Sequence, residues 1–239
     1  ISREAFDALE TGLQNVVVDP DIPLQEGDDN WDVFTPAATV TYFAPVSWTN
    51  GFLSTGMFYL SYSEGFMAGG FTPFGDELLP FEPEEIASYE LGAKLDLLDN
   101  TLRINTSVYY SEYDDIQLRV TRTFPEETLP DGTEVPAETL DGVINAGEAT
   151  MSGAEIEVNW LPTDNLVLGL TGAYIDAEYD EFLDEDADGL PIDRSNEDFA
   201  YIPETTLTLM AQYTWDLDIG ELAPRISGYY TDEVFIGLD

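Results

Sequence analysis

Hydrophobic and polar side chains alternate at every second position along most of this chain. Residues 87–97 show the pattern most clearly, with apolar side chains at the odd positions and polar or small residues between them. Residues 102–111 repeat the pattern with the apolar positions even. Alternation over about ten residues places one face of a β-strand in apolar surroundings and the other in water, whereas a helix needs a period of about 3.6 residues. The pattern therefore predicts an all-β fold.

The same alternation, followed along the chain, predicts about eight strands. Their expected ranges are roughly 33–44, 52–65, 85–98, 101–123, 143–161, 165–182, 200–216 and 222–236. We expect residues 1–32 to be a loop or partial segment that leads into the strands, which fill residues 33–239.

The connections between these strands are alternately short and long. The short ones are Pro45–Gly51, Leu98–Thr101, Leu161–Asn165 and Asp216–Glu221. The long ones, rich in Pro, Gly, Asp and Glu, cover roughly 66–84, 124–142 and 183–199. Transmembrane β-barrels have short periplasmic turns and long extracellular loops, whereas a soluble sandwich has no reason to place its long loops on every second connection. The spacing predicts an antiparallel transmembrane β-barrel.

Aromatic residues favour the same orientation. The tryptophans in or beside short turns are Trp48, Trp160 and Trp215, and the tyrosines nearer the long loops are Tyr62, Tyr110, Tyr174 and Tyr201. Two aromatic belts at the membrane interfaces would have this distribution. The alternative is that these rings fill the core of a sandwich.

The charge balance is strongly acidic. Asp and Glu number 49 against 7 Lys and Arg, which gives a formal net charge of −42. Nucleic acid is excluded as a partner, because phosphate binding needs many basic residues. A surface this acidic repels itself unless salt or divalent cations screen it. We therefore expect a salty or calcium-rich setting, with a marine or halophilic source, or else an acidic lineage that needs no special ion.

Several kinds of chemistry are absent from the composition. The chain has no Cys and no His, which excludes thiol catalysis, ordinary zinc sites and His-based triads. Asp114-Asp115 and Glu126-Glu127 resemble paired catalytic carboxylates, but adjacent residues of a strand point to opposite faces. We predict that the protein is not an enzyme.

Five motifs, in order, resemble those of TonB-dependent receptor barrels. The first is YLSYSEGF (Tyr59–Phe66) followed by GGF (Gly69–Phe71), and the second is EPEEIASYELGAK (Glu82–Lys94). The third is LRIN (Leu102–Asn105) with VYYSEYDDIQ (Val108–Gln117), and the fourth is NAGEATMSGAEIE (Asn145–Glu157). The last group is PTDNL (Pro162–Leu166), YIDAEY (Tyr174–Tyr179) and Ile202-Pro203. The resemblance covers about residues 33–236. It implies part of a 22-stranded barrel in the outer membrane of a Gram-negative bacterium, with a plug domain, energised by TonB.

That resemblance implies import of a small-molecule cargo: an iron–siderophore complex, cobalamin, haem or a sugar. No plug-like or TonB-contacting segment is recognisable in the sequence, so we expect outer-membrane lipid, the remaining strands, the plug and TonB to be partners outside it. Two alternatives stay open: a structural component of an envelope assembly, and a soluble acidic β-sandwich that binds calcium or carbohydrate.

Four residues are candidates for contact with cargo, because they lie on the predicted inward face of the outer half of the wall: Tyr109, Tyr113, Gln117 and Arg119. The alternative is a wet lumen wall that touches no cargo. On neighbouring inward faces, Glu90, Lys94 and Arg103 are expected to form a charge network.

A calcium loop is the candidate metal site. Asp184, Asp186 and Asp188 alternate and are followed by Gly189, as in the opening of a calcium-binding loop. The twelfth position is Ser195 rather than Glu, so Asp193 or Glu197 would have to supply the late carboxylate. The residues of 184–197 therefore predict a possible Ca²⁺ ligand set, with a solvated acidic loop as the alternative and no cofactor required.

Overall fold

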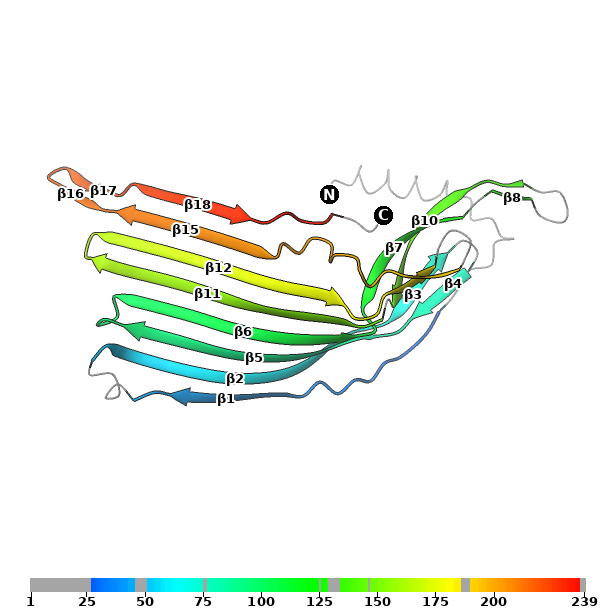
Figure 1. Ribbon diagram of the computed structural model, residues 1–239, viewed down its shortest axis with the longest axis horizontal. Helices are drawn as coiled ribbons and strands as arrows, with labels where there is room; N and C mark the ends of the chain where they lie inside the picture. Colours follow the sequence, from blue (N-terminus) through cyan, green and yellow to red (C-terminus); the bar gives the residue numbers. More distant parts are fainter. Residues whose placement is uncertain are drawn as a thin grey trace, which may run out of the picture.

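The computed structural model describes residues 27–45, 51–74, 77–124, 126–128, 134–145, 147–185 and 190–236. Within these residues every regular element is a β-strand. Eight antiparallel strands form one curved sheet in the order β1-β2-β5-β6-β11-β12-β15-β18 (Figure 1). Their bounds are Ala37–Phe43, Leu53–Met67, Glu84–Leu97, Leu102–Asp114, Ala149–Thr163, Leu166–Tyr179, Thr205–Tyr213 and Arg225–Thr231. The prediction of about eight antiparallel barrel strands is confirmed, with β1 and β18 at the two edges of the sheet.

Smaller hairpins continue from both ends of this wall. Four of the described hairpins lie within the long connections, and those labelled in Figure 1 gather at one end of the wall. They are β3 (Gly70–Phe74) with β4 (Glu77–Phe81), β7 (Gln117–Phe124) with β10 (Glu138–Asn145), β8 (Glu127–Thr128) with β9 (Glu134–Val135), and β13 (Leu183–Glu185) with β14 (Pro191–Asp193). At the opposite end, β16 (Trp215–Leu217) pairs with β17 (Gly220–Leu222) in a short turn. The predicted alternation of short and long connections is therefore present in space.

Two predicted strands are interrupted. Residues 101–123 were expected to be one strand, but β6 ends at Asp114, and Asp115 has a positive φ of 54°. Residues 143–161 are divided likewise, between Asn145 and Ala149, where Gly147 has a φ of 121°. The two breaks face each other, since the Ile116 N–H donates to the Gly147 carbonyl at 3.0 Å. At this point the chain leaves the wall and starts the separate β7–β10 hairpin.

Register aligns the apolar side chains of neighbouring strands on one face. Leu60 pairs with Leu91, Leu91 with Val108, and Val108 with Ala154. These side chains are not covered: Leu91 and Leu209 remain 55% and 50% exposed. Among the described residues the other sheets are two-stranded hairpins, so no second large sheet covers this face. A row of half-exposed leucines and valines on a single-layer sheet is typical of a face that contacts lipid.

The apolar band ends in aromatic and then acidic residues. Tyr62, Tyr89 and Tyr110 are register partners on this face, and the rings of Tyr62 and Tyr89 are 5.0 Å apart. Two residues further toward the long loops, Glu64 and Glu112 accept hydrogen bonds from Tyr62 and Tyr110. This sequence of leucine, tyrosine and glutamate is what a passage from hydrocarbon to headgroups requires.

The positions of the tryptophans agree in part with an aromatic belt at the other membrane interface, at the short-turn end. Trp160 and Trp215 lie at the short-turn end, 40% and 47% exposed, whereas Trp48 lies outside the described residues. No helix among the described residues is long and apolar enough to cross a membrane.

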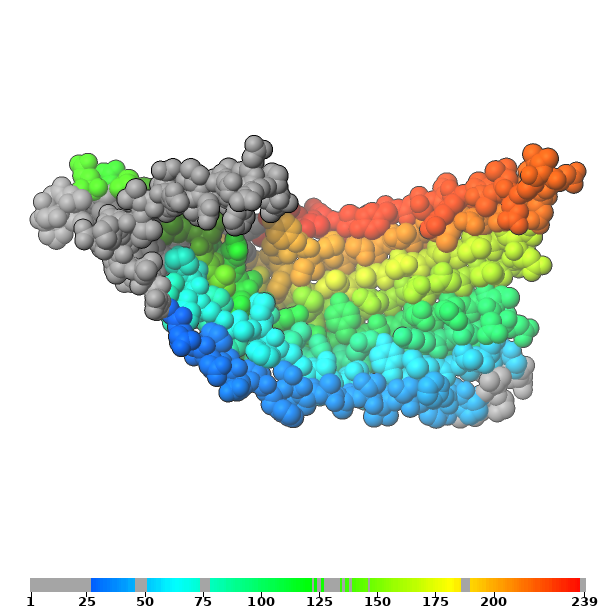
Figure 2. All heavy atoms as spheres, turned by 180° about the vertical axis from the view of Figure 1, so that it is seen from behind, coloured from blue at the N-terminus to red at the C-terminus, as the bar shows by residue number. Residues whose placement is uncertain are grey.

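Figure 2 shows the curved wall from behind, and a hollow on the polar face of the sheet is lined by residues such as Glu90, Lys94 and Asn105. Two tyrosines on this face lie across glycines of the next strand. A Cβ added to Gly92 would overlap the Tyr59 ring, and one added to Gly153 would overlap Tyr109. Tyr59 also donates a hydrogen bond to Glu90, which stands two residues before Gly92 on β5. Each tyrosine ring thus covers backbone that the glycine, which has no side chain, leaves accessible. This contact between neighbouring strands helps to fix their register.

We expect Gly92→Ala to lower the free energy of unfolding by about 1–3 kcal/mol, because the added methyl displaces the Tyr59 ring. Gly172→Ala is the matched control, since its methyl would meet only ordinary contacts at 3.5 Å or more. Equilibrium denaturation in lipid vesicles measures the difference. A Tyr59→Ala/Gly92→Ala double variant should recover part of the loss, and equal effects of the two glycine substitutions would contradict the packing explanation.

Candidate functional site

The hollowed face carries a polar network near the short-turn end. The Arg103 Nε donates to Asp96 Oδ1 at 2.7 Å, and the Thr55 hydroxyl donates to Asp96 Oδ2 at 2.7 Å. Asn105, on the same strand as Arg103, donates to Glu157 of the neighbouring strand β11 at 3.2 Å. The network predicted among Glu90, Lys94 and Arg103 is not what the described residues form, because Arg103 pairs with Asp96 and Glu90 accepts a hydrogen bond from Tyr59. Barrel interiors are polar, so this face is the lumen side.

The structure does not bring the four cargo candidates together. Tyr109 lies flat across Gly153 in the middle of the wall. Tyr113, at the outer end of β6, packs against a buried apolar cluster of Ile116, Ala149, Tyr179 and Phe182. Both tyrosines therefore serve wall packing, and their contact with cargo stays a prediction.

Gln117 is the first residue of β7, and its side-chain amide is used within the protein. Its Nε2 donates to the carbonyls of Ala68 and Glu82, each at 3.1 Å, with Met67 O at 3.4 Å. Its backbone N–H donates to Glu84 Oε2 at 2.7 Å. The sequence indicated a polar side chain at this position. It gave no signal that the amide would donate hydrogen bonds to backbone carbonyls at the ends of the β3–β4 hairpin.

Arg119 is the candidate that lines a cavity. The cavity has a volume of about 710 Å³ and lies among the hairpins at the long-loop end. Its walls come from β7, β10 and the segment that follows β12, and include Arg119, Asp141, Tyr179, Ile192, Phe199 and Tyr201. The rings of Tyr179 and Phe199 are stacked with centroids 4.0 Å apart. Tyr201 is 72% exposed and has a positive φ of 64°, so its ring stands free at the edge.

Arg194 holds one wall of this cavity. Its Nε and Nη2 donate to Glu197 at 2.6 and 2.9 Å, and its Nη1 donates to Asp184 at 3.1 Å. The guanidinium also lies 5.5 Å from the centre of the buried Phe182 ring. The carboxylates of Glu197 and Asp184 raise the pKa of Arg194, which keeps it charged. A planar, bidentate cation suits this position better than lysine would.

The calcium prediction is not tested by this arrangement. Asp184 is used by Arg194, while Asp186 and Asp188 lie outside the described residues. Both expected substitutes for the late glutamate have partners, because Glu197 accepts from Arg194 and Asp193 accepts from Ser195. The hydrogen bonds from Ser195 lower the pKa of Asp193. Among the described residues no cluster of three metal-binding side chains occurs.

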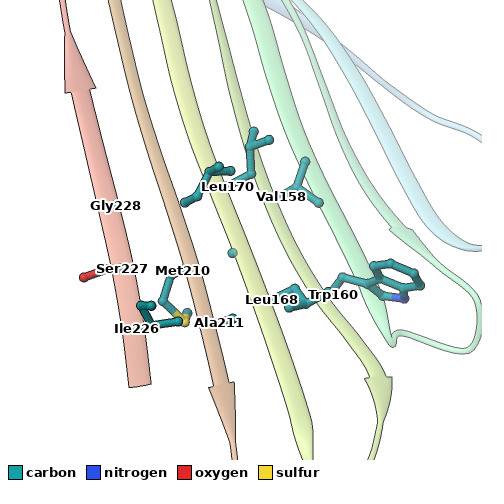
Figure 3. A pocket seen from close by; sticks show the side chains of 11 residues that line it. Val158, Trp160, Leu168, Leu170, Met210, Ala211, Ile226, Ser227 and Gly228 are labelled. Atoms are coloured by element: carbon teal, nitrogen blue, oxygen red, sulfur yellow. The ribbon is translucent and has the colours of Figure 1, made fainter. Parts of the chain in front are cut away.

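A second hollow, of about 630 Å³, lies on the apolar face (Figure 3). Its walls include Trp160, Leu168, Leu170, Leu209 and Ile226. These side chains come from the lipid-facing set near the short turns, and the surface that they offer is almost entirely apolar. Acyl chains would fill such a hollow, so we do not assign it to cargo.

Comparison with known families defines the class. The family model described as TonB dependent receptor-like, beta-barrel, matches residues 6–237. The chain therefore belongs to the TonB-dependent receptors, a family of transport receptors rather than enzymes, found in Gram-negative outer membranes. The soluble sandwich alternative is wrong, in agreement with the single-layer sheet.

Comparison with solved structures supports the same fold through FyuA. The ferric yersiniabactin uptake receptor FyuA from Yersinia pestis is similar with a TM-score of 0.56 and 19% identity, over 82% of this chain and 25% of FyuA. The siderophore receptor PiuA from Acinetobacter baumannii has a TM-score of 0.46 and 22% identity, over 66% of this chain and 22% of PiuA. The chain thus spans 25% of the length of FyuA.

We expect Arg194→Met to release the β13–β14 hairpin, because it leaves the Asp184 carboxylate, whose side chain is 6% exposed, without its cation. Removing one partner of a buried ion pair costs about 3–5 kcal/mol. Hydrogen exchange of residues 182–197 should accelerate accordingly, and Arg225→Met, at an exposed position of β18, serves as the control. Unchanged exchange in Arg194→Met would show that the triad does not order this segment.

Proposed function

We propose that this chain forms part of the wall of an outer-membrane receptor that imports a scarce nutrient, with plug and TonB as the energised partners. The observation that carries the proposal is the division of one sheet into an uncovered apolar face and a hollowed polar face. Family membership supplies the class of activity. A wall of this kind gives cargo a polar path through the membrane while lipid contacts its outside.

We further propose that cargo is first held in the cavity beside Arg119. This cavity is at the long-loop end, which in such barrels faces outside the cell. It combines exposed aromatic surface at Tyr201 with opposite charges at Arg119 and Asp141. Ligand sites pair apolar surface with a few placed polar groups in this way. An iron–siderophore complex leads the cargo classes to test, since FyuA is by name a ferric yersiniabactin uptake receptor. Cobalamin, haem and oligosaccharides follow.

Growth complementation tests import. A Gram-negative host without its own receptors, expressing the protein as its gene encodes it, should gain growth on one of these nutrients, and only with an intact TonB system. Arg119→Ala should weaken binding of that nutrient by roughly 1–3 kcal/mol, as loss of a charged hydrogen-bonding group does. Arg225→Ala, on the edge strand far from the cavity, is the control.

The competing function, a structural role in an envelope assembly, makes a different forecast. It expects stable co-purification with other envelope proteins and no nutrient-dependent growth in any TonB background. That pair of results would replace import by assembly.

The salty setting also stays a proposal, and it has its own test. The net charge of −42 should make the melting temperature rise between about 0.1 M and about 1 M NaCl, because the screening length falls from about 10 Å to about 3 Å. If the acidic loop holds calcium, Ca²⁺ should stabilise the protein beyond Mg²⁺ at equal ionic strength, and Asp186→Asn/Asp188→Asn should abolish that excess. A melting temperature independent of salt would refute the need for screening.

A further inference from the structure

Two extracellular hairpins meet at their bases through side-chain amides. Gln117 begins β7 and Asn145 ends β10, and the two residues are register partners. Both reach the strand connection at Glu82, between β4 and β5. The β7–β10 hairpin is therefore tied to the β3–β4 hairpin at the point where each leaves the barrel wall.

Asn145 uses all of its hydrogen-bonding groups in this junction. Its Nδ2 donates to the carbonyls of Asp115 and Glu82 at 2.8 and 3.0 Å. Its Oδ1 accepts the Glu82 N–H at 2.7 Å. The bond to Asp115 reaches the positive-φ residue that directly follows β6. One side chain thus joins the end of β6, the end of β10 and the base of β4.

Gln117 completes the junction from the other strand. Its amide donates to Glu82 O and to Ala68 O, so it binds both the entry and the exit of the β3–β4 hairpin. Further out, the Val143 N–H donates to the buried Thr72 hydroxyl at 3.2 Å. Two hairpins from different connections are therefore held by hydrogen bonds from base to middle.

The chemistry explains why amides stand at these positions. The Gln117 amide meets carbonyl oxygens, which require a donor, and Asn145 must donate and accept at once. A carboxylate of the same shape offers acceptors alone, and would repel the carbonyls it faces. Replacing either amide by its acid is therefore a nearly isosteric change that reverses the interaction.

We propose that Gln117 and Asn145 form an amide clamp that positions the β7–β10 hairpin, and with it the Arg119 and Asp141 wall of the cavity, relative to the β3–β4 hairpin. Both are positioning residues. Their effect on cargo capture rests on the proposed function, whereas the clamp itself does not. Without it, the hairpin would pivot at Asp115 and Gly147, where the wall strands end.

Distance measurements between spin labels test the clamp without any cargo. The chain has no cysteine, so labels attach only at introduced positions. Ala137→Cys and Pro73→Cys place labels at exposed sites on the two hairpins. In the full-length protein in detergent, Gln117→Glu and Asn145→Asp should each broaden the distance distribution. Thr123→Val, which removes the Thr123–Thr139 hydrogen bond further along the same hairpin, should leave it narrow.

Two further readouts separate positioning from general stability. Hydrogen exchange across β7 and β10 should accelerate on the order of tenfold in both variants, while the unfolding temperature of the barrel stays unchanged. In Gln117→Glu, lowering the pH below about 4 restores a donor O–H and should narrow the distribution again, relative to the unsubstituted protein at the same pH.

The outcomes are distinct. If Gln117→Glu fails to fold, Asn145→Asp and the neutral Gln117→Met carry the same test. Distributions and exchange rates equal to those of Thr123→Val overturn the clamp. The distance distribution can be narrow in the unsubstituted protein and broad in the two acid variants while the protein imports none of the tested nutrients. That combination supports the clamp and contradicts only the proposed function.

Discussion

The structure depends on the pairing of backbone groups within a single sheet. In hydrocarbon an unpaired N–H or C=O costs several kcal/mol, so each strand must satisfy its backbone through its two neighbours. The inner strands of the eight-stranded sheet do this in antiparallel register, with small register shifts only near the short turns. They are β2, β5, β6, β11, β12 and β15. Side chains are then free to divide between lipid and lumen, because register already fixes the sheet. This is why a chain with so little buried core can still specify one fold.

The eight-stranded sheet could be predicted from the alternation of apolar and polar residues, because its two faces lie in different surroundings and successive residues point to opposite faces. Leu91, Val108 and Leu209 were placed correctly because each lies in a long, regular run. The short connection Leu98–Thr101 was also predicted correctly, and its residues Asp99 and Asn100 adopt the positive φ that Asp and Asn tolerate. Local rules and the global environment agree throughout this region.

The breaks at Asp115 and Gly147 were missed because alternation continues through them. Residues 117–124 keep a strand pattern, and only the backbone conformations of Asp115 and Gly147 show that the chain changes sheets. The Asp114-Asp115 pair and the Gly of NAG were available as turn signals. The amide clamp could not have been predicted, since its acceptors are backbone carbonyls of a loop that lies 30 or more residues away in sequence.

The distribution of interactions separates rigid from adjustable parts of the receptor. Ladder hydrogen bonds fix the wall, and amide groups extend that rigidity to the bases of two hairpins. The segment after β12 is held differently, by one arginine between two carboxylates and by aromatic contacts with Phe182 and Phe199. An ion triad is sensitive to a competing charge, whereas a carbonyl–amide junction is not. If the proposed cargo carries charge, it would compete with the ion pairs of Arg194, whereas the amide junction at the base of the β7–β10 hairpin has no ion pair to lose.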